Sequence, residues 1–307
     1  MKILITGGAG FIGSHLVDKL VVDHELTILD NLSTGKIENL QSHLEQEKIN
    51  FIKGDITNTE TVKKAVKGMD AIIHLAALTS VPESIRKPLI YNKVNTIGTL
   101  KLVRQAAKSK VKQIIFSSSA AVYGNPIYLP IKETHPLKPL SPYAASKIAA
   151  ENYLKTYSNL YKIKATILRI FNAYGPRQTL SQYAGVITIF INNALKGKPL
   201  RIFGDGYQVR DFIYIEDVVE AFKLALEAKR TATYNIATGK PTKIITLAET
   251  IKELTQTKSQ ITFTKPRKGD IRYSYADITK AQNELGFQPK TTLKEGLKKT
   301  IEKWSKT

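Results

Sequence analysis

The stretch ITGGAGFIGSHL, residues 5–16, decides how the first half of this chain is organised. It spaces Gly7, Gly10 and Gly13 as GxxGxxG, directly after a short apolar run and directly before a helical pattern. Glycines allow a tight turn and let the N–H groups of a helix N-terminus approach a phosphate. A glycine motif alone also suits plain strand–turn–helix packing, but the position between strand and helix is the one that a dinucleotide-binding loop requires.

The sequence on both sides of this loop alternates between strand and helix patterns. Nearly continuous Val/Ile/Leu runs predict strands that are buried on both faces of a parallel sheet. The predicted strands are 2–6, 25–30, 50–55, 70–77, 111–119 and 164–172, and the predicted helices are 13–22, 59–67, 95–109 and 143–161. The alternation predicts an α/β fold with a Rossmann-type doubly wound parallel sheet.

The pattern loosens after residue 172. Turns such as FGDGYQ (203–208) and short strands mix with helices at 216–228 and 246–256, and an amphipathic helix closes the chain. We therefore predict a dinucleotide-binding Rossmann domain over 1–172, to which the chain later returns. Residues 173–307 are predicted to form mainly a smaller α/β substrate lobe.

Composition narrows the class of protein. The chain has 307 residues, 42% of them hydrophobic, which suffices for one large domain or two coupled lobes. Its apolar runs are far shorter than the roughly 18 residues that span a bilayer, and glycines interrupt the start where a signal peptide would stay apolar. Without cysteine, disulfides, thiolate nucleophiles and cysteine zinc sites are excluded. We expect a cytoplasmic protein with no membrane insertion.

The net charge of +20 raises the question of an anionic partner. Most of the excess is lysine, spread along the chain, and no helix-turn-helix, RNA-binding aromatic signature or zinc knuckle occurs. A solvated lysine-rich surface is favoured, and no nucleic acid is expected to bind. The histidines lack ligand spacing, so we expect no metal, and His74 reads as a core residue at the end of a buried strand; they are His15, His24, His43, His74 and His135.

Asp30 ends the second predicted strand at the distance expected after a dinucleotide loop. A carboxylate there accepts a hydrogen bond from a ribose 2′-OH and repels a 2′-phosphate. The sequence therefore favours NAD over NADP.

The segment SPYAASK (141–147) places Tyr143 four residues before Lys147, on one helix face. A phenol must gain about 3 pKa units, or about 4 kcal/mol, to ionise near neutral pH, and a cation about 4 Å away at an effective dielectric of about 20 supplies that order of energy. The spacing is also common by chance, so other motifs must decide.

Several further motifs follow in order: GDI (54–56), HLAA (74–77), SSSAAVYG (117–124) and SPYAASK (141–147). With the GxxGxxG loop, the chain resembles the extended short-chain dehydrogenase/reductase family, whose members include NAD-dependent epimerases and dehydratases of nucleotide sugars. The resemblance runs almost end to end. It implies that Tyr143 is the acid/base, that Lys147 lowers the pKa of its phenol, and that Ser119 binds the reacting oxygen. Ser117 and Ser118 read as strand-end structure, and Tyr123 as packing.

The resemblance also implies the residues that contact NAD. They are Gly7, Gly10, Phe11, Ile12, Gly13, Asp30, Asn31, Asp55, Ile56, Leu75, Ala76, Ala77, Asn95, Tyr143 and Lys147.

The C-terminal motifs imply a nucleotide-diphosphate site. RIFNAYGPRQ (169–178), YQVRDFIYIEDV (207–218) and KPRKGDIRYSYAD (265–277) resemble the family's substrate segments. Two arginines from separate segments suit a diphosphate. The implied substrate residues are Asn172, Val186, Arg210, Arg267, Asp270 and Ser274, with Asp211 beside Arg210.

The residues between Ser119 and VYG favour one reaction. Dehydratases and decarboxylases of the family carry acidic residues there, whereas this chain has Ala120 and Ala121, and the family's cysteine-dependent epimerases are excluded. We expect an NAD-dependent 4-epimerase of a UDP-hexose that works through a 4-keto intermediate. Alternatives are a UDP-glucuronate epimerase, a dehydratase, a decarboxylase, a reductase or a nucleotide-sensing protein.

Ser274 stands at the family's gatekeeper position, where glucose/galactose-only enzymes have tyrosine. A small residue leaves room for an N-acetyl group, although Tyr273 or Tyr275 could refill the space. UDP-GlcNAc and UDP-GalNAc are therefore further candidate substrates. The resemblance also implies a homodimer formed through helices near 95–109 and 143–161.

Overall fold

A computed structural model describes residues 1–179, 185–267 and 269–305 of the chain. Seven strands form one parallel sheet in the order β10-β6-β5-β4-β1-β2-β3. They are β1 (Lys2–Thr6), β2 (Glu25–Asp30), β3 (Ile49–Lys53), β4 (Ala71–His74), β5 (Gln113–Ser119), β6 (Lys164–Ile170) and β10 (Ala232–Ile236). The strand order reverses between β1 and β4, which is where open α/β sheets bind ligands. The predicted doubly wound fold is confirmed.

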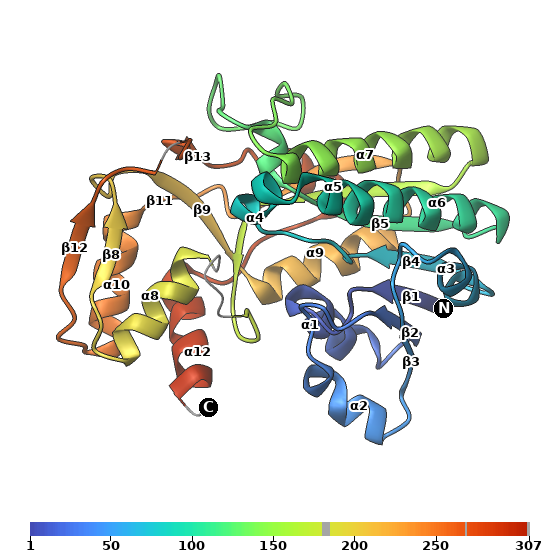
Figure 1. The fold of residues 1–307 in the computed structure, drawn as a ribbon, viewed down its shortest axis with the longest axis horizontal. Coiled ribbons are helices and arrows are strands. Elements are labelled where there is room, and N and C mark those ends of the chain that lie inside the picture. The colour runs from blue at the N-terminus through green and yellow to red at the C-terminus, as the bar shows by residue number, and fades with distance from the viewer. Residues whose placement is uncertain (180–184, 268, 306–307) are drawn as a thin grey trace.

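Helices cover both faces of this sheet (Figure 1). Because strand residues alternate between faces, Ile3 and Ile5 pack with α1 (Phe11–Leu20) and α9 (Ile215–Ala228). Leu4 faces the other way, into the core formed with α3 (Thr59–Val66), α6 (Thr99–Lys108) and α7 (Pro142–Tyr161). Short helical segments connect these elements: η1 (Ile37–Leu40), α2 (Gln41–Glu45), α4 (Val81–Arg86), α5 (Pro88–Tyr91), the π-helix η2 (Asn92–Gly98) and η3 (Ala120–Tyr123).

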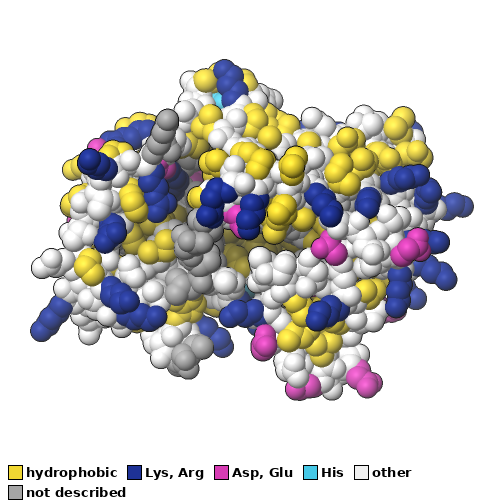
Figure 2. Space-filling view, in the orientation of Figure 1, with side chains coloured by type: hydrophobic (Ala, Val, Ile, Leu, Met, Phe, Trp, Pro, Cys, Tyr) yellow, Lys and Arg dark blue, Asp and Glu magenta, His cyan; other side chains and the backbone are white. Residues whose placement is uncertain are grey.

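The smaller lobe lies beside the carboxyl edge of the sheet (Figure 1). Its central strand β9 (Val209–Tyr214) pairs with β7 (Asn172–Tyr174), β11 (Pro241–Lys243) and β13 (Tyr273–Ser274), and β8 (Leu200–Phe203) pairs with β12 (Ile261–Thr264). The lobe's helices are α8 (Val186–Leu195), α10 (Ile244–Thr255), α11 (Thr279–Leu285) and α12 (Leu293–Ser305). Figure 2 shows the surface hollowed between this lobe and the sheet domain, with Lys and Arg side chains at the rim.

Three elements differ from the prediction. The strand predicted over 164–172 is split, because the chain leaves the sheet after Ile170 and pairs with β9 from Asn172. The helix predicted over 95–109 belongs to a longer run that contains the π-helical turns of η2. The seventh strand, β10, was not predicted, because its ATYNI sequence mixes polar and apolar residues. It brings the chain back to the sheet beside β6.

Every helix in the described part of the chain is too short or too polar to cross a membrane.

Candidate active site

The glycine loop joins β1 to α1 at the carboxyl edge of the sheet. Gly7 has a φ of +73°, and a Cβ there would lie 2.7 Å from the backbone nitrogen of Ala76. The loop is therefore pressed against the residues that follow β4. A Cβ on Gly10 would meet, among the described atoms, only the Gly7 carbonyl oxygen within 4 Å. The space beside Gly10 can hold the phosphates of a dinucleotide. The backbone N–H groups of Phe11 and Ile12, at the start of α1, can donate hydrogen bonds to those phosphates.

Asp30 connects this loop to the end of β2. One carboxylate oxygen accepts from the backbone N–H of Ala9 at 3.0 Å and the other from Leu32 at 2.8 Å. Burial raises the pKa of Asp30, and the two N–H donors oppose that effect. The carboxylate thus stands in a fixed orientation where the sequence predicts a ribose contact. Gly13 lies on the buried face of α1 behind the loop.

Asp55 and Asn31 lie together after β3 and β2. The Asn31 amide donates to Asp55 at 2.8 Å, and the backbone N–H of Thr57 donates to the other carboxylate oxygen at 2.7 Å. Burial opposes ionisation of Asp55, but these donors together hold its pKa below the usual value. Ile56, in contrast, turns into the core and packs under Gly98.

His74 ends β4 in a fully buried chain of hydrogen bonds. The Thr99 hydroxyl donates to the Asn95 carbonyl at 2.6 Å, so it accepts from Nε2 of His74 at 2.9 Å. The Thr6 hydroxyl then donates to Nδ1 at 2.7 Å. Burial, with the positive charge of Lys147, lowers the pKa of His74 to about 3. His74 is a neutral core residue, as predicted.

Asn95 holds the segment after β4 in place. Its amide donates to the Leu78 carbonyl at 2.9 Å and to the Ser146 hydroxyl at 3.0 Å, and its oxygen accepts from the Leu78 N–H at 2.8 Å. Both amide hydrogens of Asn95 therefore form hydrogen bonds within the protein. The half-buried residues that Asn95 helps to position lie at this sheet edge: Leu75, Ala76 and Ala77.

Tyr143 and Lys147 lie in the first two turns of α7. Ser141 caps the helix by accepting from the Ala144 N–H, and Pro142 suits the first helical position. The Tyr143 side chain is 7% exposed and that of Lys147 is 3% exposed. The Lys147 ammonium lies 4.4 Å from the centre of the Phe116 ring. The structure thus buries both predicted catalytic side chains at the end of β5.

Burial works against the charged form of both side chains. It raises the pKa of Tyr143, which a hydrogen bond from Ser119 lowers in part. It lowers the pKa of Lys147 to about 7, which the carboxylate of Glu151 opposes. The Ser119 oxygen accepts from the Ala121 N–H at 3.2 Å, which leaves its proton for the phenol. The predicted lowering of the Tyr143 pKa by Lys147 must therefore overcome the cost of burying the phenol.

The residues after Ser119 bring no acid to this site. Ala120 and Ala121 open η3, and Tyr123 is buried with its hydroxyl donating to Asn235 at 2.5 Å. Burial raises the pKa of Tyr123 to about 12. Tyr123 is therefore a packed, hydrogen-bonded side chain, as predicted.

Four of the predicted substrate residues lie around β9, namely Asn172, Arg210, Asp270 and Ser274. Ser274 pairs in register with Arg210, whose guanidinium donates to the Ile271 carbonyl at 2.7 Å and to Asp270 at 2.5 Å. The Asn172 amide donates to the Asp211 carbonyl at 3.1 Å. The Asp211 carboxylate is fully buried and accepts from four donors, at Thr238, Gly239 and Ala276. Asp211 thus anchors β9 and the segments on either side of it.

A cavity of about 540 Å³ lies between β8 and the segment after β12. The Arg267 guanidinium lies 3.9 Å from the centre of the Phe203 ring, and Asp270 lines the same cavity. Gln208 donates to the Phe203 carbonyl, while its buried Oε1 has no partner among the described residues. Asp205 and Arg272 form a bidentate pair at 2.6 and 2.9 Å.

The sequence did not single out Phe203, Gln208, Asp205 or Arg272. The only hint of them in the sequence is the aromatic ring and the glutamine in the FGDGYQ turn. That these residues share a cavity becomes visible only from the pairing of β8 with β12. Val186 begins α8, beyond the cavity lining, and Lys268 lies outside the described residues. In the described ranges, no three His, Asp or Glu side chains gather as metal ligands.

Known proteins share this arrangement. The model of the family described as GDP-mannose 4,6 dehydratase matches residues 4–300. A UDP-glucose 4-epimerase of Mycolicibacterium smegmatis is 40% identical over 98% of both chains. The structure of Thermotoga maritima UDP-glucose 4-epimerase with UDP-glucose is 42% identical, covers 100% of this chain and 99% of its own, and has a TM-score of 0.95.

A third similar protein acts on another sugar. The structure of UDP-N-acetylglucosamine 4-epimerase from Methanobrevibacter ruminantium is 40% identical, covers 99% of this chain and 98% of its own, and has a TM-score of 0.95. Structures of an epimerase and a dehydratase among the matches hold NAD. The match over nearly the whole length, together with the glycine loop, Asp30 and the Tyr143–Lys147 pair, places the chain in the NAD-dependent epimerase/dehydratase family of extended short-chain dehydrogenases/reductases.

Proposed function

We propose that the protein is an NAD-dependent 4-epimerase of a UDP-hexose, with UDP-glucose and UDP-galactose as the first candidates. The observation that carries the proposal is the trio of buried Tyr143, buried Lys147 and half-buried Ser119, with Ala120 and Ala121 following Ser119. The trio can move one proton at an alcohol. Because no acidic group stands at these two alanines, the site lacks the extra acid/base that elimination or decarboxylation would need there.

Each side chain has a defined task in this proposal. NAD, when bound, accepts a hydride from the sugar and returns it. Tyr143 removes the proton of the C4 hydroxyl and later gives it back, while Ser119 donates a hydrogen bond to the reacting oxygen. The Lys147 ammonium stabilises the phenolate. The 4-keto sugar must turn over between the two steps, so the sugar has to be held more loosely than the nucleotide.

The cavity beside β8 is the proposed nucleotide anchor. Arg267 supplies a cation, Phe203 a flat apolar wall, and the Oε1 atom of Gln208 an unused acceptor. Arg210 and Asn172 extend the polar surface toward the sheet edge through β9 and β7. Binding energy from the nucleotide would position the sugar, while few contacts would restrict rotation of the sugar itself.

The test is to incubate the purified protein with UDP-galactose and no added cofactor, and to follow the anomeric region by NMR. Appearance of UDP-glucose would support both epimerisation and tightly held NAD. A product of lower mass would instead indicate a dehydratase or decarboxylase. Net consumption of added NADH would indicate a reductase. Turnover of UDP-glucuronate alone would move the proposal to a uronate epimerase, and binding without turnover would indicate a nucleotide sensor.

N-acetyl sugars are a second candidate, favoured by Ser274. This small residue lies on β13 beside Arg210, and the M. ruminantium relative is named for UDP-N-acetylglucosamine. The protein should turn over UDP-GlcNAc. The Ser274→Tyr variant should lose this activity but still turn over UDP-galactose, and this pair of results would support the role of Ser274. Equal loss of both activities would contradict it.

A homodimer is also part of the proposal. Large apolar side chains are exposed on α4, α5 and the end of α7, namely Ile85, Leu89, Ile90, Leu160 and Tyr161. Figure 2 shows hydrophobic side chains gathered on the face over these helices. Light scattering should give twice the mass of one chain, and Leu89→Glu should reduce it toward the monomer.

A further inference from the structure

A row of buried polar side chains crosses three strands beneath α7. Ser118 on β5 pairs in register with Arg169 on β6, and Arg169 pairs with Asn235 on β10. Register partners in parallel strands point to the same face. All three side chains are at most 3% exposed. Burying polar groups costs free energy unless they are fully hydrogen-bonded, so each of these side chains is expected to have hydrogen-bond partners.

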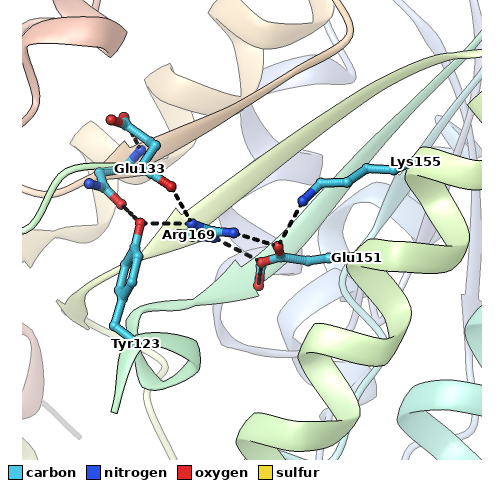
Figure 3. Close-up of polar contacts among 7 residues, drawn as sticks. Tyr123, Glu133, Glu151, Lys155 and Arg169 are labelled. Atoms are coloured by element: carbon cyan, nitrogen blue, oxygen red, sulfur yellow. Dashed lines mark hydrogen bonds and ion pairs between the residues drawn. The ribbon is translucent and has the colours of Figure 1, made fainter. Parts of the chain in front are cut away.

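Glu151 of α7 meets this row from above (Figure 3). Its Oε1 accepts from the Ser118 hydroxyl at 2.6 Å and from Nε of Arg169 at 3.0 Å, and its Oε2 accepts from the Arg169 guanidinium at 2.7 Å. Glu151 is 0% exposed. One carboxylate therefore joins α7 to β5 and β6.

The other end of Arg169 completes the network (Figure 3). It donates to the Tyr123 hydroxyl at 3.0 Å and to the Glu133 carbonyl at 3.1 Å. Tyr123 in turn donates to Asn235. Lys155, which is half exposed, approaches Glu151 to 3.6 Å at the rim.

The position of Glu151 along the chain links this network to the reaction centre. Tyr143, Lys147 and Glu151 are spaced four residues apart and lie on one face of α7. Ser118 directly precedes Ser119 at the end of β5, so a bond that holds Ser118 also holds the backbone of Ser119 in place. The carboxylate therefore fixes both segments that carry the proposed catalytic groups.

We propose that Glu151, held by Arg169, is a positioning residue for the reaction centre: it sets β5 against α7 and supplies the negative charge that holds Lys147 as an ammonium beside Tyr143. Only the expected effect on the reaction rate rests on the proposed function. The role of Glu151 in holding β5 against α7 and in keeping Lys147 charged does not depend on it.

Other charged and titratable groups lie on the elements that pack against α7 near Lys147. Tyr143 lies on its own helix, His74 is neutral on β4, and Arg169 on β6 is already paired. On the helices beside α7, Glu83 of α4 pairs with Lys87, and Tyr91 of α5 bonds to Glu83. Lys93 of η2 acts on Asp55, and Lys101 of α6 donates to the Thr57 carbonyl. Glu151 is thus the anion that opposes the burial of Lys147.

The first experiment measures Lys147 itself, without any substrate. Protein labelled with ¹³Cε-lysine is titrated by NMR, and the Lys147 signal is assigned by its loss in Lys147→Arg. The wild-type signal should titrate with a pKa of about 7, far below exposed lysines at about 10.4. In the double variant Glu151→Gln/Arg169→Met, the midpoint should fall by about one pH unit, because the carboxylate whose charge opposes the burial of Lys147 is removed.

The double variant is chosen to remain folded. Glu151→Gln alone leaves a buried guanidinium without its charge partner, which is strongly destabilising, whereas removing both charges is often tolerated. The amide that replaces the carboxylate also keeps an acceptor for Ser118. The matched control is Glu253→Gln/Lys294→Met, which removes an exposed ion pair of 2.7 Å between α10 and α12. The control should leave the Lys147 midpoint unchanged.

The second readout is the pH profile with UDP-galactose. If Lys147 must be protonated, the alkaline limb of kcat should move to lower pH by the same shift, and KM should change less than about twofold, because the nucleotide cavity is untouched. Ser118→Ala removes only the bond to β5. It should lower kcat a few-fold, with the Lys147 midpoint unchanged to within about 0.3 unit.

The outcomes separate the two proposals. A wild-type protein that does not epimerise UDP-galactose contradicts the proposed function but leaves the NMR titration decisive. A folded double variant whose Lys147 midpoint equals that of the control overturns the charge role of Glu151. If the double variant is unfolded, Ser118→Ala decides the remaining role: unchanged kcat overturns it.

Discussion

The carboxyl edge of the parallel sheet and the cavity of the smaller lobe differ in how their polar side chains are hydrogen-bonded. At the sheet edge, Asp30, His74 and Asn95 each have short hydrogen bonds to other parts of the protein. In the lobe cavity, the oxygen of Gln208 lacks a protein partner among the described residues, and Arg267 contacts an aromatic ring. These polar groups of the sheet edge are therefore already paired within the protein, whereas the Gln208 oxygen in the lobe is not paired with any described residue.

This difference fits two kinds of binding. A cofactor that is reduced and reoxidised within one cycle benefits from a rigid site that keeps it. A sugar that must turn over benefits from an anchor at a distance and freedom near the reacting carbon.

Tyr143→Phe should abolish turnover while leaving the fold intact. The variant keeps the buried ring and removes the hydroxyl that we propose transfers the proton, so kcat with UDP-galactose should fall by at least about 10³-fold. NMR of the anomeric region measures the rate, and absorbance of the denatured protein measures retained NAD. Tyr157→Phe, on the same helix with its ring stacked on Tyr161, is the matched control and should be fully active. A Tyr143→Phe enzyme within tenfold of wild type would remove Tyr143 from the reaction.

Asp30→Ala should release the cofactor. It removes the acceptor of the Ala9 and Leu32 N–H groups and the proposed partner of the ribose, so the Kd for NAD should rise by about 100-fold. Equilibrium dialysis of protein stripped of NAD measures this directly. Asp70→Ala is the control, because Asp70 likewise accepts from a backbone N–H, that of Lys2 at 2.9 Å, but at the opposite end of β1. An equal loss of NAD in both variants would mean that general destabilisation is the cause.

Arg267→Leu should weaken substrate binding without slowing the chemical step. Loss of a cation from the proposed diphosphate site should raise KM by about 10- to 100-fold, with kcat within about threefold of wild type. Initial rates over a range of UDP-galactose concentrations separate the two constants. Arg201→Leu, at an exposed position of β8, serves as the control. A fall in kcat with unchanged KM would place Arg267 at the reaction centre instead of at the anchor.

The sequence predicted the parts of this molecule that depend on neighbours along the chain. The glycine loop and the spacing of Tyr143 and Lys147 are local, and their helical context follows from caps and periodicity. The seventh strand could not be predicted, since only its pairing with β6 shows that ATYNI belongs to the sheet. The contact of Glu151 with Arg169 and that of Arg210 with Asp270 also join separate elements. Burial, which shifts the pKa of Lys147, is a property of the packed fold and has no counterpart in the YxxxK spacing.

The smallest effect is expected for the bidentate pair of Asp205 and Arg272 at the rim of the cavity. Both side chains are about half exposed, so the pair should contribute little to holding its two loops together. Arg272→Ala should change KM by less than about fivefold at low salt, and the difference should vanish at high salt because screening already weakens an exposed pair. Asp205→Ala should match it, and the double variant should be no worse than either single one. A change above tenfold, or one that persists in high salt, would show that this side of the cavity is as firmly organised as the sheet edge.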